Sequence, residues 1–179
     1  MPRYVALFRG INVGKAKRVA MADLRALLET LGYTAVKTLL NSGNAVFTGG
    51  AGSPDKHAQR IRAAVANKLG VDATVIVKSS KDIAAIIAGN ALEKVATNPS
   101  RLLVVMTADA KALGALKALA SRSWGKEKVH IGKHAAYVWC AESILESQAL
   151  EALLGALGTG GTTRNWATLS RVHVLMTTG

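Results

Sequence analysis

The stretch AVKTLLNSGNAVFTGG, residues 35–50, carries two short apolar runs on either side of Asn41-Ser42-Gly43-Asn44. Asn and Gly tolerate the positive φ angles of tight turns, so the pattern predicts a strand, a turn and a second strand. Gly49-Gly50 follows the second run and ends the hairpin. The hairpin decides the fold, because it inserts an antiparallel pair into an otherwise alternating series of strands and helices.

The segments before the hairpin predict a strand and a helix. Residues 3–8, RYVALF, are a short apolar run that is typical of a buried strand. Leucines at positions 24, 27, 28 and 31 fall on one face of a helix, and Gly32 ends it.

The segments after the hairpin complete the order. Ser53-Pro54 begins a helix that Gly70 ends, and residues 72–78 form a β-branched strand. Ser79 or Ser80 then caps a short helix. The order from residue 3 to residue 78 is β-α-β-β-α-β, which is that of a ferredoxin-like α/β plait.

The second half repeats this order in outline. Residues 101–106 predict a strand, 108–120 a helix, 128–140 a hairpin and 146–158 another helix. Residues 162–176, TTRNWATLSRVHVLM, are ambiguous, since positions 166, 169, 173 and 176 have helical spacing whereas Val172 and Val174 alternate as in a closing strand. We therefore expect an α+β protein with two tandem ferredoxin-like halves, each with an antiparallel sheet. The expected domains are residues 1–91 and 100–179, joined by a linker over 92–99.

The composition favours a basic, cytoplasmic protein. The 179 residues include 23 Lys and Arg against 11 Asp and Glu, a net charge of +12. Such a surplus attracts nucleic acids, phosphorylated metabolites or acidic protein surfaces, although charges spread over solvated faces would affect only solubility. Cys140 is the single cysteine, which excludes an internal disulfide and a cysteine-based zinc site. No run approaches the roughly 20 apolar residues of a membrane span, and the N-terminal run is too short for a signal peptide.

The loop RGINVGKAKR, residues 9–18, is the first candidate binding site. It carries Arg9, Lys15, Lys17 and Arg18, no acidic residue, and glycines at positions 10 and 14. The spacing departs by one residue from the nucleotide loop G-x-x-x-x-G-K-[ST], and Ala16 stands where that loop needs a hydroxyl for magnesium. What remains is a group of cations just before a helix N-terminus, where exposed amides and the helix dipole favour an anion. The alternative is that the glycines only turn the chain and the basic side chains stay in water.

Two further polar loops have both a local and a functional interpretation. Ser42 and Asn44 belong to the hairpin turn, and they can also present polar groups to a ligand. In TTRNW, residues 162–166, Thr163 or Asn165 can cap the final helix while Trp166 packs. In the functional interpretation, the forked guanidinium of Arg164 would bind an anion together with the threonine hydroxyls beside it.

No catalytic or metal-binding constellation is visible in the sequence. The histidines at positions 57, 130, 134 and 173 lack metal-ligand spacing, the acidic residues form no pair, and Cys140 ends an apolar strand as a small buried hydrophobe would. The plait and the basic charge invite comparison with RNA-binding modules that stack bases on strand aromatics. Tyr4, Phe8 and Phe47 are expected in the core instead, because the chain has so few aromatic residues. We expect no cofactor and no metal.

The segments YVALFRGINVGKAKRVAMADLRALLETLGY, LNSGNAVF and TTRNW, in this order, resemble the bacterial family known as domain of unknown function 1697. The resemblance implies tandem α/β plaits and a C-terminal helix, and it implies no activity. It places a group of residues in the family's motifs, namely Arg9, Gly10, Asn12, Gly14, Ser42, Gly43, Asn44, Thr163, Arg164, Asn165 and Trp166. Lys15 stands where a second glycine is usual, which weakens a glycine-lined phosphate cradle and adds a charge.

The leading hypothesis is a non-catalytic protein that binds an anionic partner, either a nucleic acid or a phosphorylated small molecule. Arg9, Lys15, Lys17 and Arg18 would supply the charge, and Asn12, Asn44 and Arg164 would add polar groups. One alternative is an enzyme for a small acidic or phosphorylated substrate that Arg9 and Arg164 orient. Another is a structural module whose motifs serve turns and packing.

Overall fold

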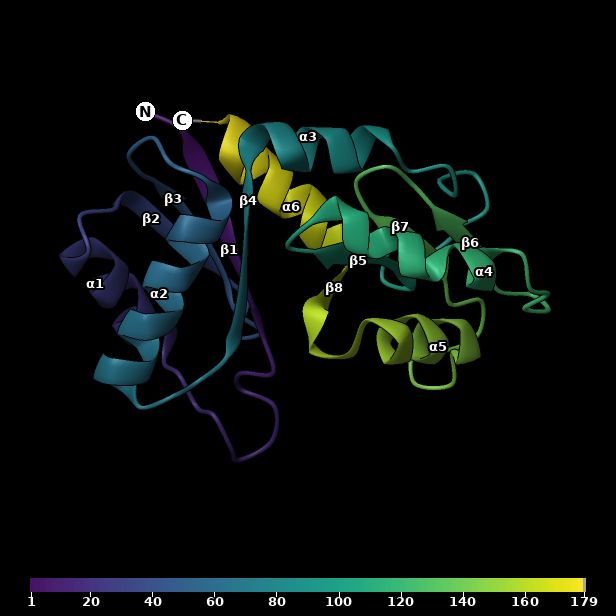
Figure 1. Cartoon of the computed structure of the whole chain (residues 1–179), viewed down its shortest axis with the longest axis horizontal. Helices are drawn as coiled ribbons and strands as arrows, with labels where there is room; N and C mark the ends of the chain where they lie inside the picture. The colour runs from purple at the N-terminus through teal and green to yellow at the C-terminus, as the bar shows by residue number, and fades with distance from the viewer. Residues whose placement is uncertain (179) are drawn as a thin grey trace. The chain divides into compact units, whose positions relative to one another are not determined.

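The computed structural model of the chain describes residues 1–178 and separates into two compact units (Figure 1). One unit comprises Met1–Ile83 with the C-terminal segment that starts at Val172, and the other comprises Ala84–Arg171. Two helices, α3 (Ser80–Ala88) and α6 (Trp166–Thr177), each begin in one unit and end in the other. No helix within residues 1–178 has the length and apolar character needed to span a bilayer.

The first unit is built on an antiparallel sheet in the order β2-β3-β1-β4. Its strands are β1 (Arg3–Arg9), β2 (Thr34–Leu39), β3 (Asn44–Thr48) and β4 (Thr74–Ser79). The central strand β1 pairs with β3 on one side and β4 on the other, and the hairpin predicted from residues 35–50 joins β2 to β3. The ferredoxin-like order predicted for this half is confirmed.

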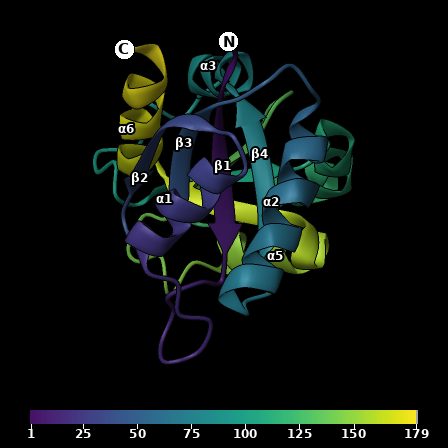
Figure 2. The ribbon, with the colours of Figure 1, turned by 90° about the vertical axis from the view of Figure 1, so that its left-hand side faces the viewer.

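Two helices, α1 (Met21–Thr30) and α2 (Pro54–Leu69), lie side by side over one face of this sheet (Figure 2). The predicted boundaries of α2 are confirmed: the Ser53 hydroxyl accepts the N–H of Lys56, and Gly70 ends the helix at φ +68°. Tyr4, Phe8 and Phe47 are 1–3% exposed or fully buried in the core that these helices cover. Their rings are therefore packing groups, as expected, and offer no surface on which bases can stack.

The second unit has a sheet of the same type in the order β6-β7-β5-β8. Its strands are β5 (Leu102–Thr107), β6 (Lys128–Ile131), β7 (Ala136–Trp139) and β8 (Gly161–Asn165). The ambiguous C-terminal segment contains both elements: β8 pairs with β5, and α6 follows directly. The closing strand lies over residues 161–165 rather than over Val172 and Val174, which belong to α6. Asn165 caps that helix, since its Oδ1 accepts the Thr168 N–H at 2.8 Å.

The helices of the second unit differ in part from expectation. The helix predicted over 108–120 is a 3-10 helix, η1 (Ala110–Leu116), followed by the short α4 (Lys117–Ala120). Gly114 interrupts the segment, and glycine is a poor residue for the interior of an α-helix. The later predicted helix is α5 (Gln148–Leu157). The Ser147 hydroxyl caps its N-terminus by accepting the Leu150 N–H, and the short 3-10 helix η2 (Gly158–Gly160) follows its C-terminus. These helices cover a core that includes Val105, Leu116 and Leu153.

The boundaries between the two compact units fall within α3 and α6. Residues 84–91 group with the second unit, where the Tyr137 hydroxyl donates a hydrogen bond to the Ile86 carbonyl. Residues 172–178 group with the first, where the Arg3 guanidinium donates to the carbonyls of Leu175, Met176 and Thr178 at 3.2–3.3 Å. A composition shift marks a linker, but it cannot show which core a helix joins.

Tyr137 should lose its proton only well above the ordinary pKa of tyrosine, 10.0. Burial raises its pKa from 10.0 to about 12. The folded protein therefore holds this proton more tightly than the unfolded chain does. The free energy of unfolding should be unaffected by ionisation of Tyr137 below pH 10 and should decrease as the pH rises from 10 toward 12. An ultraviolet titration of tyrosinate should show a late step that Tyr137→Phe removes. A native protein whose tyrosines all titrate together near pH 10 would contradict the assignment.

Candidate anion-binding site

The loop after β1 is closed by the side chain and backbone of Asn12. The Asn12 N–H donates to the Lys17 carbonyl at 3.0 Å, and its Nδ2 donates to the Val19 carbonyl at 2.8 Å. In return, the Val19 N–H donates to Asn12 Oδ1 at 2.7 Å. Asn12 adopts φ +56°, a left-handed conformation that asparagine accepts more readily than most residues. The loop therefore has a defined shape, which Asn12 sets from inside.

The same side chain ties the loop to the hairpin turn between β2 and β3. Asn12 Nδ2 donates a second bond to the Asn41 carbonyl at 2.8 Å, and the Phe8 N–H donates to the Gly43 carbonyl at 3.0 Å. Asn44 is fully buried, and its Nδ2 donates to the Leu39 carbonyl at 2.8 Å and toward Ser42 Oγ at 3.4 Å. Two motif segments far apart in sequence thus form one local structure, and these hydrogen bonds of Asn12 and Asn44 hold it together.

The basic side chains of the loop differ in their surroundings. Lys15, Lys17 and Arg18 are exposed, whereas Arg9 is half-buried at the end of β1. Arg18 crosses the loop, because its Nη1 donates to the carbonyls of Asn12 at 3.4 Å and Gly14 at 3.2 Å. Lys15 makes no hydrogen bond or ion pair within residues 1–178. The loop thus presents cations to solvent, one of which is held in place.

The charge of Lys17 is shared with a neighbouring ion pair. The Arg62 guanidinium, whose Nε lies 2.7 Å from Asp72 Oδ1, holds the pKa of that carboxyl below its ordinary value. Lys17 contributes further to this lowering, so its ammonium group lies within electrostatic reach of Asp72.

An open cavity of about 560 Å³ lies where the loop meets α1. Its lining includes Asn12, Arg18, Asn41 and the first residues of α1. Ala20 occupies the N-cap position, so no side chain caps the first N–H groups of this helix. Uncapped amides and the helix dipole favour an anion at this end, and Arg18 adds a positive charge. Asp23, in the first turn of the helix, also lines the cavity and opposes an anion.

The cavity contains some of the predicted site residues and omits others. Asn12, Arg18 and Asn41 of the hairpin turn line it, and so does Asp23, which the sequence did not single out. Gly10 and Gly14 provide the turns of the loop at φ +75° and +65°. The only sequence signal for Asn41 was its place in the turn motif, and Asp23 carried none.

The third predicted group belongs to the second unit. Thr163, Arg164 and Asn165 lie on β8, opposite Val105, Val104 and Leu103 of β5. Arg164 is 8% exposed, and its Nη1 donates to the Thr163 carbonyl at 2.7 Å and to Thr162 Oγ1 at 3.0 Å. Burial lowers the pKa of this guanidinium to about 10. Arg164 is therefore buried, and two of its hydrogen bonds are made within its own strand.

Two groups of types that commonly carry catalysis, His57 and Cys140, are buried in the core. His57 is 9% exposed, with Nδ1 at 2.8 Å from the Tyr33 hydroxyl and Nε2 at 3.2 Å from the Gly50 carbonyl. Cys140 is fully buried, and burial raises the pKa of its thiol. Within residues 1–178, no cluster of three or more His, Cys, Asp or Glu side chains is arranged to hold a metal ion.

Comparison with known proteins identifies a family and a fold. A model of the family described as "Protein of unknown function (DUF1697)" matches residues 1–137, which include the loop and the hairpin turn. A conserved bacterial protein from Streptococcus pneumoniae has a similar structure, with a TM-score of 0.79 and 24% sequence identity over 98% of both chains. This likeness shows a shared fold. No curated protein matches the sequence.

Proposed function

The chain belongs to the DUF1697 family of proteins of unknown function, and we propose that it binds an anionic partner through the loop of residues 9–18 without catalysing a reaction. The partner is a phosphate-bearing molecule, either a phosphorylated small molecule or a nucleic acid. The loop's exposed cations and the net charge of +12 support this proposal through long-range attraction.

The observation that carries the proposal is the uncapped N-terminus of α1 beside Arg18. An anion in the cavity would accept hydrogen bonds from the first amides of the helix and lie close to a guanidinium that two backbone carbonyls already position. Lys15 adds charge from the loop. Asp23 reduces the net attraction, so we expect a modest affinity that falls steeply as salt rises.

The loop would contact a nucleic acid only through the sugar-phosphate backbone of the nucleic acid. Tyr4, Phe8 and Phe47, the aromatic residues on β1 and β3, lie in the core and are unavailable for stacking. Contacts to phosphate oxygens carry no sequence information by themselves. Binding through this loop would therefore be insensitive to base sequence.

The proposal is tested by removing charge from the loop and, separately, from elsewhere. One variant combines Lys15→Ala, Lys17→Ala and Arg18→Ala. The control combines Lys111→Ala, Lys117→Ala and Lys133→Ala, three exposed lysines of the second unit. Both variants lose the same net charge. Inorganic phosphate, a nucleoside triphosphate and a short single-stranded oligonucleotide are titrated into each protein at two salt concentrations.

We expect the loop variant alone to weaken binding by about tenfold, an effect of roughly 1.4 kcal/mol. For the oligonucleotide, the slope of log affinity against log salt should flatten by about one for each phosphate group that the variant no longer neutralises. Equal weakening by the two variants would mean that diffuse charge, and not the loop, attracts the partner. No binding of any probe to the wild-type protein would also refute the proposal.

A further inference from the structure

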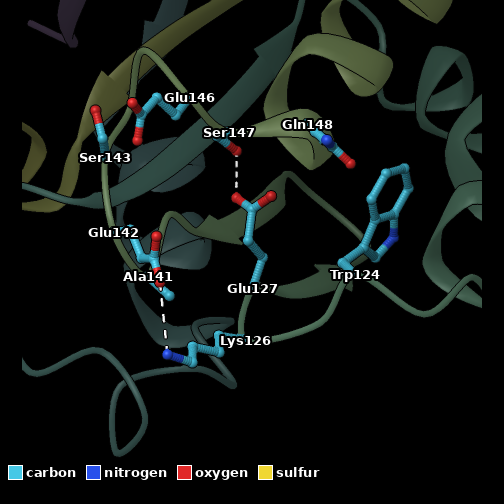
Figure 3. Close-up of a pocket in the computed structure, with 9 residues that line it drawn as sticks. All are labelled: Trp124, Lys126, Glu127, Ala141, Glu142, Ser143, Glu146, Ser147 and Gln148. Atoms are coloured by element: carbon cyan, nitrogen blue, oxygen red, sulfur yellow. Dashed lines mark hydrogen bonds and ion pairs between the residues drawn. The ribbon is translucent and has the colours of Figure 1, made fainter.

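A second cavity, in the other unit, has the opposite electrostatic character. It has a volume of about 340 Å³ and lies between the segment before β6, the loop after β7 and the start of α5. Figure 3 shows Trp124 and Gln148 on one side of Glu127, and Ser143 with Glu146 on the other side. This volume falls within the range of small-molecule sites, about 300–1,000 Å³.

The acidic residues of the second half gather at this cavity. Three of the five that follow Pro99, namely Glu127, Glu142 and Glu146, line it, although the chain as a whole has a net charge of +12. Among the described residues that line the cavity, Lys126 is the only cation, and its Nζ lies 3.5 Å from Glu142 Oε1. The lining therefore carries a net negative charge, which attracts cations.

The three carboxylates differ in the hydrogen bonds and ion pairs that they make within the protein. Glu127 is bound to the N-terminus of α5, where it accepts hydrogen bonds from the Ser147 hydroxyl and, at 3.3 Å, from the Ala149 N–H. Glu142 is shared with Lys126 in an exposed ion pair, and such pairs exchange readily. Glu146 has no hydrogen bond or ion pair within residues 1–178. Glu146 and Glu142 are thus available to bind a cation, whereas the hydrogen bonds of Glu127 hold the start of α5 in place.

An indole ring supplies the second component of the cavity. Trp124 donates its Nε1–H to the Leu119 carbonyl at 2.8 Å, which fixes the ring orientation. The ring packs partly against the core and also lines the cavity. A tryptophan face attracts organic cations, and its apolar surface accommodates methylene groups.

We propose that this cavity binds a primary ammonium group carried on an aliphatic chain. The methylene groups would lie against Trp124, and the ammonium would donate hydrogen bonds to Glu146 and Glu142. Gln148 and Ser143, on opposite sides of the cavity, add neutral polar groups to its lining. A free diamine and a lysine side chain of another protein share this chemistry, and the experiment separates them.

The test uses calorimetric titration of the full chain with cadaverine, with a short lysine peptide, and with pentanediol as the uncharged analogue. We expect an amine to bind and pentanediol not to bind. Glu146→Gln should weaken the amine by about threefold to fivefold, and the double variant Glu142→Gln, Glu146→Gln by about tenfold. Glu151→Gln is the matched control, since Glu151 is an exposed acid of α5 outside the cavity, and it should change nothing.

A second measurement locates the ligand directly. The indole N–H resonance of Trp124 should shift on addition of cadaverine or the lysine peptide, whichever is the better ligand, and the shift should vanish in the double variant. Melting curves of the variants check that each remains folded. Equal weakening by Glu151→Gln, or amine binding with an unmoved Trp124 resonance, would overturn the proposal. Binding of neither amine would overturn it as well.

Discussion

Gly43→Ala should destabilise the protein by about 3 kcal/mol. Gly43 has φ +94°, and a methyl group at this position would lie 2.7 Å from Ile11 Cδ1 and 2.8 Å from Phe8 Cβ. The left-handed backbone costs a non-glycine residue about 1–2 kcal/mol, and forcing a methyl into a packed core costs about 1–3 kcal/mol. The effect is measured as the free energy of unfolding in urea.

Gly14→Ala is the matched control for this substitution. Gly14 also has positive φ, at +65°, but no atom lies within 4 Å of the added methyl. The control should therefore lose only the backbone part, about 1 kcal/mol. If the two variants lose equal stability, the turn is not packed against β1 and the following loop in the way described.

Asn12→Ala should cost a similar amount, about 3 kcal/mol. It removes hydrogen bonds to the Val19 N–H, the Val19 carbonyl and the Asn41 carbonyl, each with a net contribution of about 1 kcal/mol. The hydrogen bond from the Val19 N–H to Asn12 Oδ1 is partly buried, so its loss should cost more than the loss of a fully exposed hydrogen bond. Alanine also fits φ +56° less well than asparagine.

Two variants separate the parts of this effect. Asn12→Gly loses the same three hydrogen bonds but avoids the strain of alanine at this backbone angle, so it should cost less than Asn12→Ala. Asn67→Ala removes an exposed asparagine from α2 and should stay within about 0.5 kcal/mol of wild type. Urea unfolding compares all three variants. Similar stability of Asn12→Ala and the wild-type protein would mean that the loop shape does not depend on this side chain.

Much of the fold could be predicted because its signals are local. Gly43 and its neighbours mark a turn, Ser53-Pro54 and Gly70 mark both ends of a helix, and each acts within a few residues of itself. Asn165 is a similar case, since its side chain caps the helix that begins at the next residue. Such signals also fixed the order of elements, from which the plait topology follows.

The parts that could not be predicted depend on distant segments. The strand β8 contains Thr162 and Arg164, polar residues without an apolar alternation, and it is defined by pairing with β5. The cavity beside α1 is equally non-local, because Asn41 reaches it from the hairpin turn and Asp23 from the helix. The acidic cavity joins residues from three separate segments, none of which carries a motif.

The anchoring of the C-terminal residues by Arg3 has a consequence for biosynthesis. The first unit includes the segment that starts at Val172, and the guanidinium of Arg3 holds the carbonyls of Leu175, Met176 and Thr178. During translation these residues leave the ribosome only after every residue of the second unit. The first unit therefore begins synthesis before the second unit but can complete its fold only after it. Until then, Arg3 of β1 lacks the backbone carbonyls of the C-terminal segment that it binds in the folded protein.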